Sequence, residues 1–146
     1  MRNILFIILG FAVVPIASAG CYIDKRGDPT CVSNDGSFYA TFAKGIDNGR
    51  RIYLIPRDFE RCEKSEIGQD DSIYINNVKV RMVINCSADG YVHYYPMTQK
   101  GQDHLLRQFI TRKIVSIKFI DGGGMSFDTS EFNQAVAKVM DKRDGL

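Results

Sequence analysis

The sequence carries almost no net charge. Its 146 residues include 19 Lys and Arg against 17 Asp and Glu, which gives a formal net charge of +2. A dedicated nucleic-acid binder normally has a basic stripe, so this balance argues against nucleic acid as a partner. Beyond the N-terminal segment no apolar run is long enough to span a bilayer. We find no internal repeat or low-complexity segment, and the length predicts a single folded domain.

Residues that most enzymes and metal sites need are scarce. The chain has only two histidines, His93 and His104, and no Gly-x-Ser-x-Gly motif, which disfavours nucleophilic hydrolysis. It has no Cys-x-x-Cys pair, so we expect no metal and no cofactor. The pattern around His93 is more typical of a cross-strand packing residue than of a general base. We expect a non-enzymatic protein, with a carboxylate-based hydrolase as the third hypothesis.

Residues 1–19 have the three parts of a secretory signal peptide. One positive charge precedes an uncharged apolar run that ends at Val14, and residues 17–19 (Ala-Ser-Ala) form an A-x-A-like cleavage site. The run is shorter than the ~20 residues of a membrane span, and Pro15 follows it. We therefore predict a mature domain of residues 20–146 that is periplasmic or secreted.

The four cysteines predict two disulfides in an exported protein. Of the three possible connectivities we expect Cys21 with Cys31 and Cys62 with Cys86, because each pairing closes a short loop. Each bond should contribute roughly 2–4 kcal/mol to stability. A lipoprotein with an acylated Cys21 is the alternative, but Ser18 stands where such signals usually have Leu, and acylation would leave an odd thiol.

Most of the mature sequence follows β-strand patterns. The expected strands cover residues 38–42, 51–55, 72–75, 78–84, 91–95 and 114–120. Turn signals separate them, among them Asn76-Asn77, because Asn tolerates a positive φ.

Two segments change to a helical period. Apolar residues recur at helical spacing within residues 102–112. A second helix should follow Asp128, with Glu131 completing a capping box before an apolar stripe. Antiparallel strands with two short helices predict a mainly β fold, either a β-sandwich or a partly open barrel, with α+β as a further possibility.

The strand at residues 91–95 is the best candidate for a binding face. Alternation places Tyr91, His93 and Tyr95 on one side and Tyr94 on the other. We expect Tyr94 to point outward, because the side with three rings has more apolar area to bury. Tyr91, Tyr94, Tyr95 and the neighbouring Arg81 are the predicted binding residues, since exposed tyrosines are favoured at interfaces. The alternative is tyrosines that lie flat over a sheet edge.

Two short motifs carry no functional assignment. Residues 26–28 (Arg-Gly-Asp) spell an integrin-binding tripeptide, but chance alone produces it at a rate on the order of a few per cent. The glycines at residues 122–124 lack the Lys-Ser/Thr of a phosphate-binding loop and are expected to form a hairpin turn.

Short motifs between residues 70 and 140 resemble the invasion-associated locus B family of exported bacterial proteins. They are residues 86–90 (Cys-Ser-Ala-Asp-Gly), a helix-like linker, a strand that ends at Phe119, and residues 132–135 (Phe-Asn-Gln-Ala). Tyr91 and Glu131 depart from the family pattern, which usually has Cys and Gly at these positions. The resemblance implies a small β-sandwich protein at the host interface or envelope, and it carries over no catalytic residue.

Together these observations predict an exported, non-enzymatic binding protein that acts at the bacterial envelope or host interface on a protein partner. The alternative is a periplasmic inhibitor or immunity protein that neutralises a secreted toxin or lytic enzyme. The partner's identity and the oligomeric state are left open.

Overall fold

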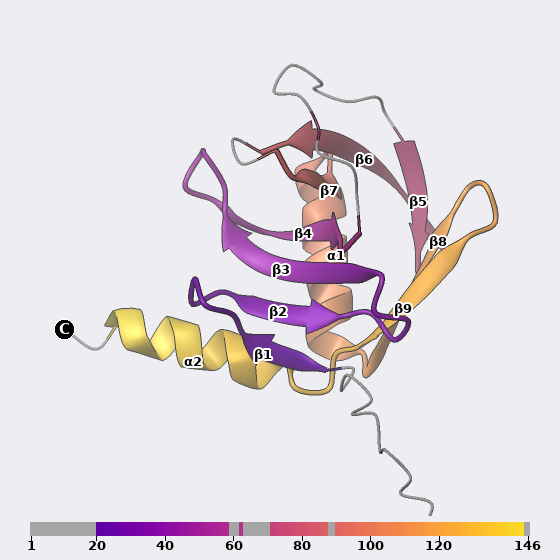
Figure 1. Cartoon of the computed structure of the whole chain (residues 1–146). Helices are drawn as coiled ribbons and strands as arrows, with labels where there is room; N and C mark the ends of the chain where they lie inside the picture. The colour runs from indigo at the N-terminus through magenta and orange to yellow at the C-terminus, as the bar shows by residue number, and fades with distance from the viewer. Residues whose placement is uncertain (1–19, 59–61, 63–70, 88–89, 145–146) are drawn as a thin grey trace, which may run out of the picture.

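The computed structural model describes residues 20–58, 62, 71–87 and 90–144. The expected signal peptide, residues 1–19, lies outside this range. Within the described residues, nine strands form one antiparallel sheet and two helices pack on it (Figure 1). The strands are β1 (Cys21–Ile23), β2 (Pro29–Val32), β3 (Phe38–Lys44), β4 (Arg50–Pro56), β5 (Asp71–Ile75), β6 (Val78–Cys86), β7 (Val92–Pro96), β8 (Ile114–Phe119) and β9 (Gly124–Asp128). The helices are α1 (Gln99–Thr111) and α2 (Phe132–Asp144).

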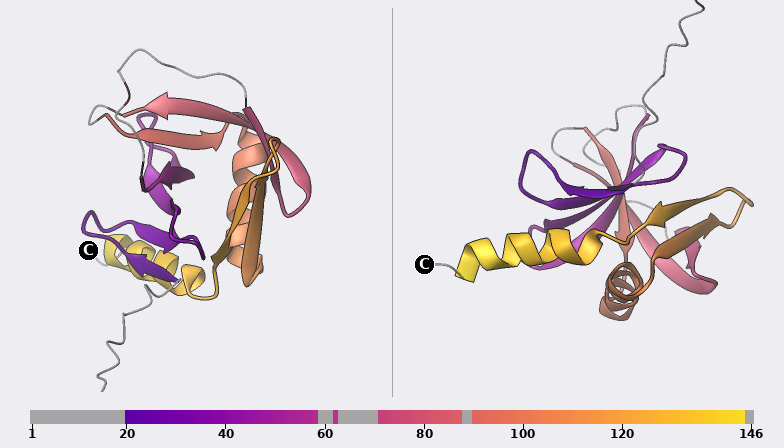
Figure 2. Two further views of the ribbon diagram at one scale, coloured as in Figure 1. Left: turned by 45° about the vertical axis from the view of Figure 1, so that its right-hand side comes forward. Right: turned by 90° about the horizontal axis from the view of Figure 1, so that it is seen from below.

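The sheet bends until its ends nearly meet, as the two views of Figure 2 show. Its strand order is β1-β2-β3-β4-β7-β6-β5-β8-β9. A bridge between Ser33 and Phe127 joins the end of β2 to β9, and the Asn34 N–H donates to the Ser126 carbonyl at 2.8 Å. The mainly β, partly open barrel with two helices is therefore confirmed.

The hydrophobic core lies on the side of the sheet that the helices cover. Leu105 and Phe109 of α1 and Phe132 of α2 are fully buried there. The Phe109 ring lies 5.6 Å from Phe127 and 5.3 Å from Phe132, between centroids. Each such side chain contributes roughly 1.5–3 kcal/mol through burial. The strand residues of this core are Ala40, Phe42, Ile52, Leu54, Ile73, Ile75, Val80, Met82, Val115, Ile117, Met125 and Phe127.

Both expected disulfides form. Cys21 and Cys31 are direct cross-strand partners on β1 and β2, and Cys62 bonds to Cys86 at the end of β6. All four cysteines of the sequence are thereby used. Disulfides persist in oxidising compartments, so the pairs indicate an extracytoplasmic location. Among the described residues, neither helix is long and apolar enough to cross a bilayer.

Helix α1 begins three residues before the predicted start. Thr98 is its N-cap, and the Thr98 hydroxyl accepts the Gly101 N–H at 3.1 Å. Gly101 is needed because the first turn lies directly on the sheet. A Cβ at this position would lie 3.0 Å from Pro96 Cβ and 3.1 Å from Val80 Cγ1.

The predicted cap of α2 is wrong. Asp128 is the last residue of β9, and its carboxylate accepts the N–H of Ser130 at 3.0 Å and the hydroxyl of Ser130 at 2.7 Å. The Asp therefore stabilises the turn before the helix, which begins only at Phe132. The Asn76-Asn77 hairpin is confirmed, with φ of 44° and 69° at the two residues.

Candidate functional site

The face of the sheet opposite the core carries a row of side chains across four strands. The register pairs Tyr22 with Thr30, Thr30 with Thr41, and Thr41 with Tyr53. Paired residues point to the same face, so two small threonines lie between two large rings. Neighbouring strands are ~4.8 Å apart, which places β1 and β4 roughly 14 Å apart. The centre of the row is therefore lower than its ends.

This row lies in a cleft of about 650 Å³. Its walls carry the aromatic residues Tyr22, Tyr39, Tyr53, Tyr91 and His93. Its polar lining comes from Asp24, Arg26 and Asp28 of one hairpin, from Lys44 at the end of β3, and from Asn85 and Ser87 at the end of β6. The volume falls in the usual range of ligand sites, ~300–1,000 Å³.

The floor of the cleft is preformed. The hydroxyl oxygens of Thr30 and Thr41 lie 3.1 Å apart, and the two residues are only 3% and 8% exposed. Thr30 Oγ1 also lies 3.3 Å from the Asp28 carbonyl oxygen. Both buried hydroxyls thus have protein partners, as buried polar groups require.

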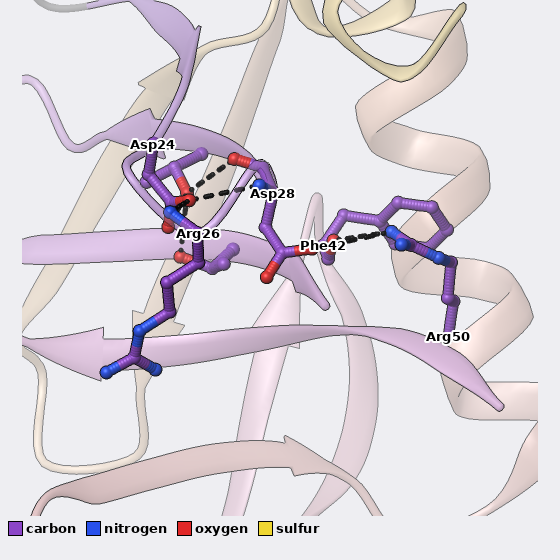
Figure 3. Close-up of polar contacts among 7 residues, drawn as sticks. Asp24, Arg26, Asp28, Phe42 and Arg50 are labelled. Atoms are coloured by element: carbon purple, nitrogen blue, oxygen red, sulfur yellow. Dashed lines mark hydrogen bonds and ion pairs between the residues drawn. The ribbon is translucent and has the colours of Figure 1, made fainter. Parts of the chain in front are cut away.

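Asp24 holds the β1–β2 hairpin in shape beside the cleft (Figure 3). Its Oδ1 accepts the N–H of Arg26 at 2.9 Å and the N–H of Asp28 at 3.0 Å. Its Oδ2 lies 3.4 Å from the Thr30 hydroxyl, and Gly27 supplies the positive φ of 83° that the turn requires. Asp24 therefore organises this end of the cleft.

The Arg-Gly-Asp tripeptide is part of this hairpin. The Asp28 carboxylate lies 3.6 Å from the Arg50 guanidinium, and its side chain is only 19% exposed. Arg50 also donates to the Phe42 carbonyl at 3.3 Å and stacks over the Phe42 ring (Figure 3). The carboxylate that an integrin motif must present is held against Arg50, which favours a structural role.

Beside the cleft, aromatic rings of β4 and β7 pack against one another. The Tyr53 ring lies 5.3 Å from His93 and 5.5 Å from Tyr95, edge to face in both cases. His93 stacks on Tyr95 at 6.3 Å, and the Arg51 guanidinium lies 5.4 Å from the centroid of the Tyr95 ring. His93 is thus a cross-strand packing residue, as the sequence predicts. Such ring pairs contribute about 0.5–1.5 kcal/mol beyond their burial.

Burial shifts the pKa of three rings of the cleft, those of Tyr22, Tyr53 and His93. Burial raises the pKa of Tyr22 above 10.0, and the neighbouring Tyr39 and Asp24 add to this increase. Burial also raises the pKa of Tyr53. Burial lowers the pKa of His93 below its ordinary value of 6.5, against a smaller opposing effect of its hydrogen bond to the Tyr91 backbone. The phenols of Tyr22 and Tyr53 therefore remain protonated and the imidazole of His93 neutral at pH 7.

Only part of the predicted binding face belongs to the cleft. Tyr91 lines it and is 46% exposed. Tyr95 shares the same face of the sheet but packs beside the cleft, and Arg81 is exposed on β6 outside the lining.

The expectation that Tyr94 points outward is wrong. Tyr94 packs against the core, and its ring lies 6.5 Å from Phe38. Its partner on β4 is Leu54, which is 1% exposed. The prediction compared the number of rings on the two sides of residues 91–95. The neighbouring strand β4, however, determines which side of β7 is buried.

Three cleft tyrosines were not predicted, namely Tyr22, Tyr39 and Tyr53. The alternation of the strand patterns at 38–42 and 51–55 could have placed Tyr39 and Tyr53 opposite the apolar face. Nothing local marks Tyr22, because its place depends on pairing with β2. Among the residues that the structure describes, no group of three His, Cys, Asp or Glu could hold a metal ion.

We predict that Tyr94→Ala lowers the free energy of unfolding by about 3–5 kcal/mol, because it leaves a cavity beside Phe38 and Leu54. Tyr91→Ala, a truncation of an exposed ring nearby, should cost less than about 1 kcal/mol. Urea denaturation measures both values. Equal costs would contradict the assignment of the two faces.

The low pKa of His93 predicts that stability falls as the solution is acidified. Below about pH 6.5 the unfolded chain binds a proton at His93 that the folded chain does not, so the free energy of unfolding decreases until the folded pKa is reached. His93→Phe keeps a ring beside Tyr53 and Tyr95 and should flatten the dependence between about pH 7 and pH 5.

Urea denaturation at several pH values measures this dependence. An unchanged slope in His93→Phe would refute the prediction.

Comparison with known proteins supplies no relative from which the role of the cleft could be transferred. No family model, no curated protein and no solved structure matches this chain. The likeness to the invasion-associated locus B family therefore stays a hypothesis. The role of the cleft has to be argued from its own residues.

Proposed function

We propose that this protein is an exported, non-enzymatic binding protein that acts at the bacterial envelope or host interface, in the periplasm or after secretion. Its binding surface is the tyrosine-lined cleft on the face of the sheet opposite the helices. The observation that carries this proposal is the row in which Tyr22 and Tyr53 flank the small residues Thr30 and Thr41.

The chemistry of the cleft favours binding over catalysis. The Tyr53 ring is held between His93 and Tyr95, and burial raises the pKa of its phenol. His93 stacks on Tyr95 and is used in packing. Tyrosines supply a large amphipathic contact area at a low cost in side-chain entropy. Tyr22 and Tyr91, each 46% exposed, have ring area available for contact with a ligand. The two disulfides support a function outside the cytoplasm, because disulfides persist in oxidising compartments.

A second candidate function, inhibition of a toxin or lytic enzyme, is favoured by Ile46. This side chain is fully exposed at the β3–β4 hairpin tip. The tip is braced by Asp47, which accepts the Gly49 N–H at 3.2 Å and pairs with Arg51. A rigid hairpin with an apolar tip has the shape of a segment that enters the cleft of another protein.

The proposal is tested by co-sedimentation of the labelled mature chain with envelopes of the producing bacterium and with host cells. Wild type should co-sediment with at least one of them. Tyr22→Ala should weaken this binding by about tenfold or more, since interface anchors typically cost ~2 kcal/mol.

Tyr74→Ala is the matched control, because Tyr74 is a partly exposed tyrosine on β5, outside the cleft lining. It should bind like wild type. Equal binding by Tyr22→Ala and wild type would contradict the role of the cleft. If Ile46→Asp alone abolishes binding, the inhibitor function is favoured instead.

A further inference from the structure

We infer that the ligand of the cleft is an uncharged, linear oligosaccharide. This inference rests on the proposed function and names the chemical class that the cleft would bind. Three features of the cleft lead to it: its elongated shape, its ring-lined walls and its balanced charge.

The cleft crosses the sheet from β1 to β6 and also extends along the strands. One end is formed by hairpin tips at Asp24 and Ile46, and the other by Ser87 and Tyr91 beyond the ends of β6 and β7. These ends are opposite, because β7 runs antiparallel to β4. The seven residues of β4 span roughly 20 Å at ~3.4 Å per residue. A cleft of this length suits a chain of several units.

The walls suit the two kinds of surface that a sugar ring presents. The faces of Tyr22, Tyr39 and Tyr53 carry negative charge density, which attracts the weakly positive C–H groups of a pyranose face. A tyrosine hydroxyl can both donate a hydrogen bond to a sugar hydroxyl and accept one from it. The low floor of Thr30 and Thr41 leaves room for the sugar ring between the tyrosines.

The charges that line the cleft cancel. Asp24 and Asp28 are matched by Arg26 and Lys44. Asp24 accepts hydrogen bonds within its hairpin, and Asp28 faces Arg50. The lining therefore has as many acidic as basic side chains, and this balance does not select a charged ligand.

An extended peptide is the main rival, and the backbone of the cleft disfavours it. Peptides that add to a sheet need a strand edge with unpaired N–H and C=O groups. Of the four strands below the cleft, β2, β3 and β4 are each paired on both sides within the described sheet, and β1 pairs with β2 at the edge of the cleft. Recognition on this face must use side chains, as recognition of a sugar does.

The test titrates the mature chain with cellohexaose, maltohexaose and chitohexaose. The sequence has no Trp, so intrinsic fluorescence reports on tyrosines, four of which line the cleft. At least one hexasaccharide should bind saturably. Its Kd should rise by about tenfold or more in Tyr22→Ala and stay within about twofold in Tyr74→Ala.

Two measurements keep the result interpretable. Tyr22→Phe retains the ring and should keep most of the affinity, which separates a stacking role from a local folding defect. Because no ion pair is involved, the Kd should not change between about 0.05 M and about 0.5 M NaCl.

The inference is overturned if none of the three hexasaccharides binds, if Tyr22→Ala binds like wild type, or if binding weakens steeply with salt. If wild type still co-sediments with envelopes or host cells through Tyr22 while no hexasaccharide binds, the ligand class is wrong and the binding function stands. If neither kind of binding is found, both proposals fail.

Discussion

The cleft depends on the pairing register of the first four strands. The disulfide between Cys21 and Cys31 joins directly opposed positions of β1 and β2, and the contact between the Thr30 and Thr41 hydroxyls joins β2 to β3 at 3.1 Å. Side chains alternate with a period of two, so a slip of one residue would turn the cleft floor into the core face. The disulfide and the buried hydroxyl pair oppose such a slip. They act on opposite faces of β2, because Cys31 is buried in the core while Thr30 forms the floor of the cleft.

The two faces of the sheet have different roles. The face that the helices cover forms the hydrophobic core, and the opposite face forms the cleft. Helices α1 and α2 bury Phe109 and Phe132 against one face, with Gly101 permitting the close approach of α1. The opposite face is stabilised by its own rings, in which Tyr53 contacts both His93 and Tyr95. Because these contacts do not depend on the core, the exposed rings of the cleft can be changed at little cost to folding. This separation is why substitutions on the two faces should have different effects.

Strands β1 and β2 were not predicted from the sequence. Local patterns were sufficient to predict strands β3 to β8, the Asn76-Asn77 turn, both helices and both disulfides. These features depend on residues that are close in sequence or on a short closed loop. Tyr94 was assigned to the wrong face because its burial depends on Leu54, forty residues earlier and on a strand that pairs with β7 only in the folded sheet. Tyr22 was missed for the same reason. It joins the cleft only because β1 pairs with β2, β2 with β3, and β3 with β4. The early start of α1 reflects the cap at Thr98, which the apolar period does not include.

The central claim is that Tyr22, Thr30, Thr41 and Tyr53 form one row on the face opposite the core. Nuclear Overhauser effects between side-chain protons in solution test it most directly, because they report on proton pairs closer than about 5 Å, the spacing of cross-strand neighbours. The account predicts cross-peaks from Tyr22 to Thr30, from Thr30 to Thr41, and from Thr41 to Tyr53. Cross-peaks that join the side chains of Thr41 and Leu54 instead, as a shift of one residue would produce, would contradict it.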